Sequence, residues 1–79
     1  MKSGFRLSVA IPVHNEETAL PELVQRTRVV LDQIPGGPHE LLFVDDGSTD
    51  RTMAILEQAA REDARIFVMS LLVPLMLRT

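Results

Sequence analysis

The sequence predicts an α/β fold in which strands and helices alternate, in the order β-α-β-α-β, around a short parallel sheet. Three observations support this prediction. Apolar runs of strand length occur three times in the 79 residues, and two segments with the 3.6-residue period of a helix separate them. Turn-forming or acidic segments divide these elements. Strands that alternate with helices of this length imply crossover connections and parallel pairing.

The first predicted strand is residues 6–13, a nearly continuous apolar run with β-branched residues. Such a run is typical of a strand covered on both faces. Pro12 cannot donate to a neighbouring strand, so we expect the strand to end there or nearby. A secretory signal would need a longer apolar stretch and a cleavage site of small residues, so a strand is favoured.

The first helix is predicted from about residue 19 to residue 31. Pro21 suits its first turn, where the missing N–H is not needed. The turn residues 34–38 end the helix. Its apolar stripe consists of Leu20, Leu23, Val24, Thr27, Val30 and Leu31.

Residues 39–44 return to the strand pattern, and His39 falls in the loop at the amino-terminal end of this strand. A second helix is predicted from Thr52 to about residue 61, and a third short strand at residues 66–69. The helix has three candidate N-caps, namely Ser48, Thr49 and Asp50.

The composition is that of a globular chain, with 46% hydrophobic and 24% charged residues. The formal net charge of −3 gives no electrostatic reason to expect nucleic acid as a partner. The chain has no cysteine, which excludes a disulfide framework and a thiolate metal site. No stretch approaches the ~18 apolar residues of a transmembrane helix.

Polar clusters follow the first two predicted strands, at the edge where parallel sheets bind ligands. Asp45 and Asp46 are adjacent, so one carboxylate can face a ligand while the other turns toward backbone donors. A carboxylate is a natural acceptor for a ring N–H of a nucleobase or for a ribose hydroxyl. Gly47 permits a tight turn. The alternative interpretation is a capped strand-to-helix turn without a ligand.

The cluster after the first strand contains Asn15 and Glu16, which could pin a ribose or a base. The alternative is a solvated loop whose acidic residues begin the helix. His14 alone is weak evidence for a ligand. No histidines or acids have the helical spacing of metal ligands, and neither a dinucleotide-binding motif nor a P-loop is present.

Together the two clusters resemble family 2 glycosyltransferases. Residues 7–17 resemble the family's opening strand, which typically ends in Ile-Pro-x-Tyr/His-Asn-Glu, and residues 42–52 match its Val-Asp-Asp-Gly-Ser-x-Asp-x-Thr element. The resemblance covers roughly residues 6–70 and is greatest to polyprenyl- or dolichyl-phosphate sugar transferases. It implies a partial Rossmann-like GT-A domain, with residues 1–70 as its N-terminal nucleotide-binding part.

The resemblance also implies the site. The donor would be a nucleotide-diphosphate sugar used with Mg or Mn, the acceptor a lipid phosphate, and the location cytoplasmic, at the cytoplasmic face of the membrane in full-length form. Asp46 would meet the base edge, while Asp45 and Ser48 shape the turn beside it. The base and ribose would be lined by Pro12, Val13, Asn15 and Glu16.

The chain departs from the family after the third strand. An Arg-Asn-x-Gly segment is typical there, but residues 71–79 form an atypical apolar tail. The Asp-x-Asp element that holds the metal is missing, so we assign no catalytic residue and no metal ligand. We therefore expect a truncated piece of a sugar transferase that is inactive alone.

Two other functions remain open from the sequence. A small non-catalytic nucleotide-binding or interaction module would bind a uridine or guanosine nucleotide without turnover. A phosphoryl-accepting receiver domain also has an acidic pair, but that pair follows the first strand rather than the second. Physically, a three-stranded sheet with two helices leaves open edges and an uncovered face, so we expect marginal stability or self-association.

Overall fold

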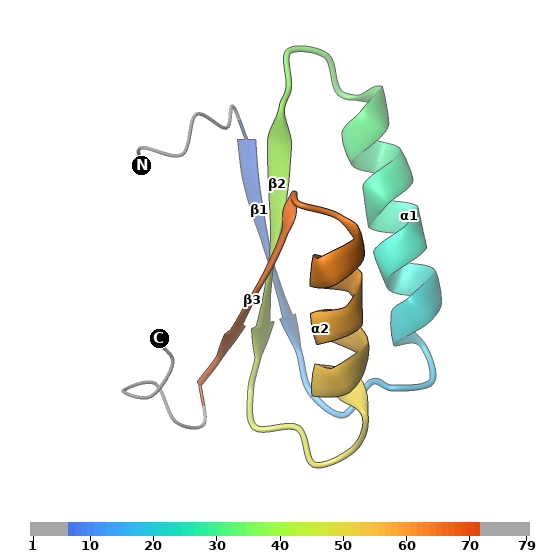
Figure 1. Cartoon of the computed structure of the whole chain (residues 1–79), viewed down its shortest axis with the longest axis vertical. Helices are drawn as coiled ribbons and strands as arrows, with labels where there is room; N and C mark the ends of the chain where they lie inside the picture. The colour runs from blue at the N-terminus through green and yellow to red at the C-terminus, as the bar shows by residue number, and fades with distance from the viewer. Residues whose placement is uncertain (1–6, 72–79) are drawn as a thin grey trace.

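The computed structural model describes residues 7–71, which form one three-stranded sheet with two helices on one of its faces (Figure 1). The strands are parallel and lie in the order β1-β2-β3. The predicted element order and the parallel sheet are therefore confirmed. The elements are β1 (Leu7–Val13), α1 (Leu20–Gln33), β2 (His39–Asp45), α2 (Thr52–Glu62) and β3 (Ile66–Ser70).

The hydrophobic core lies between the sheet and the two helices. Each crossover joins neighbouring strands, and crossovers of the same hand place both helices on the same face. α1 packs against β2 and α2, while α2 packs against β2 and β3. Strand residues alternate between the two faces, so every second one enters the core. The buried apolar residues are Val13, Leu20, Val24, Leu31, Leu41, Phe43, Leu56, Ala59 and Ile66.

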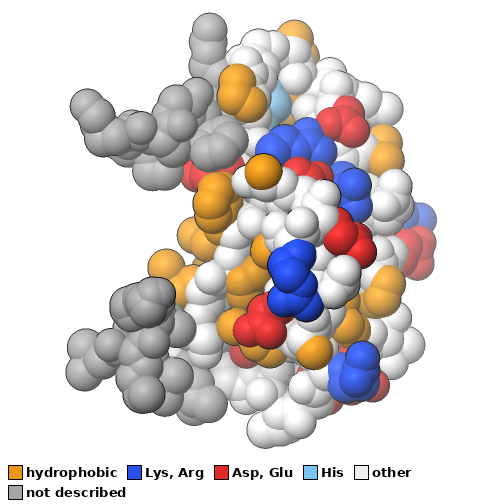
Figure 2. Space-filling view, viewed as in Figure 1, with side chains coloured by type: hydrophobic (Ala, Val, Ile, Leu, Met, Phe, Trp, Pro, Cys, Tyr) orange, Lys and Arg blue, Asp and Glu red, His pale blue; other side chains and the backbone are white. Residues whose placement is uncertain are grey.

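The other face of the sheet carries no helix among residues 7–71. Phe67 and Met69 alternate with the core residues of β3 and are 42% and 43% exposed. Leu71, which follows β3, is 48% exposed. Figure 2 shows hydrophobic side chains gathered over the sheet, on the left of the view, and charged side chains of both signs over the helices. Among residues 7–71, the apolar face opposite the helices is therefore not covered by another element, as expected from the sequence.

Ion pairs join the helices at the amino-terminal end of the strands. The Arg65 guanidinium donates to both carboxylate oxygens of Asp63, with Nε at 3.1 Å and Nη2 at 3.0 Å. Arg65 also reaches Asp32 of α1 at 2.7 Å, and Arg28 of α1 lies 3.2 Å from Asp63. The hydrogen bonds from Arg65 lower the pKa of Asp63, and the same bonds raise the pKa of Arg65. This cluster fixes α1 against the α2–β3 connection.

The structure corrects several details predicted from the sequence. α1 continues to Gln33, and Val30 is 53% exposed rather than part of the core. Asp45 is the last residue of β2 rather than part of the turn. His39 is the first residue of β2 and is buried, with its Nε2 donating to the carbonyl of Ile34 at 3.1 Å.

The predicted apolar tail lies outside the described residues, apart from Leu71. The N–H of Leu71 donates to the carbonyl of Asp45 at 2.9 Å, which extends the pairing of β3 with β2 by one residue. In the part of the chain that the structure describes, no helix combines the length and the apolar character needed to cross a bilayer.

Candidate functional site

Two loops meet at the carboxyl-terminal edge of the sheet. Residues 14–19 follow β1 and residues 46–51 follow β2, and these neighbouring strands end side by side because Val13 pairs with Asp45 (Figure 1). The N–H of Asp46 donates to the carbonyl of Val13 at 3.0 Å, which ties the second loop to the first strand. This edge is where open parallel sheets bind their ligands.

The two adjacent carboxylates have different environments. Asp45 is 3% exposed, and its carboxylate accepts hydrogen bonds from the Ser48 backbone N–H, at 3.2 Å, and from the Ser48 hydroxyl. Gly47, with φ of +72°, supplies the left-handed conformation that turns the chain back to bring Ser48 there. Asp46 is exposed, and its carboxylate has no hydrogen bond or ion pair with any residue from 7 to 71. Asp45 therefore holds the turn, whereas the Asp46 carboxylate stays exposed to solvent.

Asn15 holds the second loop rather than presenting a free amide oxygen. Its Oδ1 accepts the N–H of Thr49 at 2.7 Å, and its own N–H donates to Ser48 Oγ at 2.8 Å. These contacts require φ of +48°, a conformation that asparagine tolerates better than most residues. The loops are thereby fixed to each other on both sides of Asn15.

His14 also connects the loops. Its Nδ1 lies 2.6 Å from the carbonyl oxygen of Asp46, and since a carbonyl only accepts, Nδ1 carries the hydrogen. Nε2 is then free to accept from Asn15 Nδ2 at 3.3 Å. The histidine therefore fixes the backbone at Asp46, a role that sequence reasoning did not assign.

A third set of bonds joins the first loop to the start of α2. Thr52 is completely buried, and its Oγ1 accepts the N–H of Glu16 at 2.8 Å. Glu17 and Asp50 make a reciprocal arrangement: Asp50 accepts the Glu17 N–H at 3.3 Å, and the Glu17 carboxylate accepts the Arg51 N–H at 3.0 Å. Sequence reasoning missed Glu17 and Thr52 as residues that build the site.

The structure places the N-cap of α2 at Arg51, with no capping bond from its side chain, rather than at one of the predicted residues Ser48, Thr49 and Asp50. Asp50, one residue before Arg51, still binds an N–H at the start of the helix. Its Oδ1 accepts the N–H of Thr52 at 2.9 Å, whereas the Ser48 hydroxyl is directed to Asp45 instead. A hydrogen bond with the Thr52 side chain is the main cause that lowers the pKa of Asp50, with further lowering from backbone N–H groups. Asp50 therefore stays ionised beside the start of α2.

The seven residues predicted for the nucleotide lie at or next to the carboxyl ends of β1 and β2, but their side chains differ in access. Those of Val13 and Asp45 are buried, and that of Ser48 is half-buried. Exposed side chains belong to Pro12, Asn15, Glu16 and Asp46. Since the Asn15 amide oxygen is occupied, Glu16 and Asp46 are the predicted residues best able to accept from a ligand.

The edge is acidic. Its carboxylates belong to Glu16, Glu17, Asp45, Asp46 and Asp50. Such an edge favours neutral groups with N–H and O–H donors, and it disfavours phosphate. No group of three or more histidine, cysteine or acidic side chains in residues 7–71 is arranged to hold a metal ion, so these residues do not fit a Mg or Mn site.

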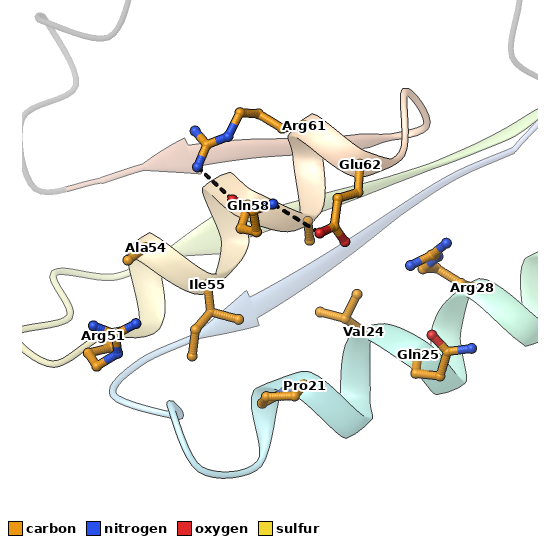
Figure 3. A pocket seen from close by; sticks show the side chains of 11 residues that line it. Pro21, Val24, Gln25, Arg28, Arg51, Ala54, Ile55, Gln58, Arg61 and Glu62 are labelled. Carbon is orange, nitrogen blue, oxygen red and sulfur yellow. Dashed lines mark hydrogen bonds between the residues drawn. The ribbon is translucent and has the colours of Figure 1, made fainter.

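A second concavity lies on the outer surface of the helices. A groove of about 530 Å³ runs between α1 and α2 (Figure 3), and its lining includes the buried residues Val24 and Ala59. Along its α2 rim, Gln58 accepts from Arg61 and donates to Glu62, both at 2.9 Å. None of the seven predicted residues lines this groove.

Comparison with known proteins gives consistent matches. The model of the family described as Glycosyl transferase family 2 matches residues 8–71. A protein from Pectobacterium carotovorum subsp. carotovorum, named undecaprenyl-phosphate 4-deoxy-4-formamido-L-arabinose transferase, is 46% identical over 66 residues, which are 84% of this chain and 20% of the relative. Proteins of the same name from Shewanella sediminis and Pseudomonas aeruginosa are 48% identical over 56 residues and 45% identical over 62.

These two matches cover 71% and 78% of this chain, and 17% and 18% of the relatives. The chain thus spans about one fifth of the length of the curated relatives it matches. No solved structure matches it.

Proposed function

The chain belongs to glycosyl transferase family 2, and from this membership we propose that the whole protein transfers a sugar from a nucleotide-diphosphate sugar to a polyprenyl phosphate. The acceptor is inferred from the relatives, whose names specify undecaprenyl phosphate. A lipid acceptor also favours a location at the cytoplasmic face of the membrane. In this proposal residues 7–71 supply the base- and ribose-binding loops.

The observation that carries the proposal is the difference in environment between the two adjacent aspartates. Asp45 is buried and satisfied by Ser48, whereas the Asp46 carboxylate is exposed at the strand ends and has no partner among residues 7–71. A carboxylate accepts hydrogen bonds only, so it selects a base whose edge carries a ring N–H. Uracil and guanine have such an N–H, whereas adenine and cytosine present an unprotonated ring nitrogen at the same edge.

Other groups complete the proposed site. Glu16 is exposed on the loop after β1, at the same edge of the sheet as Asp46, and suits the two hydroxyls of a ribose. Pro12 is exposed at the end of β1, where its ring offers an apolar surface to the base. The proposed Mg or Mn would be held with the diphosphate by groups outside residues 7–71, since the acidic edge described here suits neither a phosphate nor, by its arrangement, a metal.

Calorimetric titration with the four nucleoside diphosphates tests this proposal. We expect uridine or guanosine diphosphate to bind, and adenosine and cytidine diphosphates to bind at least tenfold more weakly, a difference of about 1.4 kcal/mol. The variant Asp46→Asn presents an amide that both donates and accepts, so it should reduce this selectivity. Equal affinity for all four nucleotides in the unchanged protein would contradict the assignment of Asp46.

A further inference from the structure

Glu17 is bound to the start of α2 by both its backbone and its side chain. Its N–H donates to Asp50 Oδ2 at 3.3 Å, and its Oε1 accepts the N–H of Arg51 at 3.0 Å. Both partners lie more than thirty residues further along the chain, immediately before the first residue of α2. The contact therefore joins two segments that the sequence separates by a helix and a strand.

The position of this contact matters because the exposed acceptors belong to different loops. Glu16 follows β1, and Asp46 follows β2. Within residues 7–71, the segment from Glu16 to the start of α1 is held to residues 50–52 by the bond from the Glu16 N–H to Thr52 and by the two bonds of Glu17. Without the bond to the Glu17 carboxylate, this segment is attached to residues 50–52 by the backbone N–H groups of Glu16 and Glu17 alone, within residues 7–71.

We infer that Glu17 is a positioning residue of the nucleotide site, which acts through the N-terminal end of α2 to fix the separation between the Glu16 and Asp46 carboxylates. This inference rests on the proposed function. Glu17 is half-buried and its carboxylate is engaged with the Arg51 N–H, so it does not itself contact the nucleotide. Its contribution is to preorganise the two loops, which lowers the ordering cost that binding would otherwise incur.

Two substitutions distinguish the effect of the length of the Glu17 side chain from the effect of its negative charge. Glu17→Gln keeps the length of the side chain and an oxygen that accepts the Arg51 N–H, but it removes the negative charge. Glu17→Asp keeps the charge but shortens the side chain by one methylene, so the acceptor no longer reaches. A matched control is Glu57→Gln, which removes the same charge from an exposed position of α2.

The test measures the affinity of the full chain for uridine and guanosine diphosphates, together with amide hydrogen exchange by NMR. We expect Glu17→Gln and the control to bind within about threefold of the unchanged protein, and Glu17→Asp to bind about tenfold more weakly, which corresponds to about 1.4 kcal/mol. Exchange at the Arg51 amide should accelerate in Glu17→Asp alone, while the amides of β2 keep their protection. A residue that supported only stability would instead lose protection throughout the sheet.

Three outcomes would overturn the inference, and they differ from one another. If Glu17→Asp binds as tightly as the unchanged protein, although Arg51 exchange is faster, positioning is wrong and the proposed function stands. If Glu17→Gln binds weakly while Glu17→Asp binds as tightly as the unchanged protein, charge rather than reach is responsible. If the unchanged protein binds neither nucleotide, the nucleotide site itself is wrong and the inference fails with it.

Discussion

Replacement of Thr52 by valine should remove one bond that ties the first loop to α2, without disturbing the core. Valine has nearly the shape of threonine, and the two have similar helix propensities, so packing at this completely buried position is preserved. The change removes the Oγ1 acceptor that the Glu16 N–H reaches at 2.8 Å. A net hydrogen bond contributes about 1 kcal/mol, and an unsatisfied buried donor costs about 1–3 kcal/mol. Because this N–H is only partly buried, we expect a loss of about 1–2 kcal/mol.

Urea denaturation followed by circular dichroism measures this loss of stability. The slope of the free energy of unfolding against urea concentration should not change. Thr52→Ser is the informative partner, since it keeps the hydroxyl and loses one methyl group, a cost of about 0.8 kcal/mol or more. Stability alone does not distinguish these variants, but hydrogen exchange does. The Glu16 amide should lose protection in Thr52→Val and keep it in Thr52→Ser.

Thr49→Val is the surface control, because the Thr49 hydroxyl lies 3.5 Å from Asn15 Oδ1 and is exposed. It should change stability by less than about 0.5 kcal/mol. The reasoning would be refuted if Thr52→Val were as stable as the unchanged protein and its Glu16 amide were equally protected. The Thr52 hydroxyl would then have no part in holding the loops.

Three further predictions concern the rest of the molecule. Asp63→Asn should cost about 1–2 kcal/mol at neutral pH, because it weakens the paired bonds from Arg65. Those bonds lower the pKa of Asp63 below its ordinary value of 3.8. Their contribution to the free energy of unfolding is therefore complete above pH 3.8 and is lost as the pH falls through the lower pKa of the folded protein. Urea titrations from pH 7 to pH 2 should show the stabilities of the variant and the unchanged protein converging at low pH. Gly47→Ala should cost about 1–2 kcal/mol in the same assay, because alanine is strained at φ of +72°, and an unchanged midpoint would contradict the turn geometry. Met69→Lys should reduce self-association, measured by sedimentation velocity, because it places a charge on the exposed apolar face of the sheet. The control Gln33→Lys adds the same charge on α1 and should leave self-association unchanged. Equal effects of the two substitutions would indicate that charge, rather than the apolar face, is responsible.

The order of elements could be predicted because local patterns determine it. The apolar runs at β1 and β2, the helical period of α1 and the proline-glycine turn after it each depend on residues close in sequence. The strand ends then followed from parallel pairing, which brought the two polar clusters to one edge. The boundaries were less certain, since the pattern did not show that α1 continues to Gln33.

The division between Asp45 and Asp46 was predicted in outline, because successive residues of an extended chain point to opposite faces. The contacts of Glu17 and Thr52 were not, since their partners lie more than thirty residues away and no local pattern specifies them. The burial of Thr52 was also not predicted, because a threonine at the start of a helix is usually exposed to solvent. Here the first loop contacts Thr52, and no local sequence pattern indicates that contact.

The central claim is that the acidic edge formed by the two loops, and not the groove between the helices, receives the nucleotide. The most direct measurement is the ¹³C NMR signal of the Asp46 carboxylate, followed together with the amide signals during titration with uridine diphosphate and then guanosine diphosphate. The account predicts that one of them shifts the Asp46 carboxylate and the amides of residues 14–17 and 46–49, and that Asp46→Asn weakens its binding. Shifts confined to Arg51, Arg61 and the other residues of the interhelical groove would contradict it.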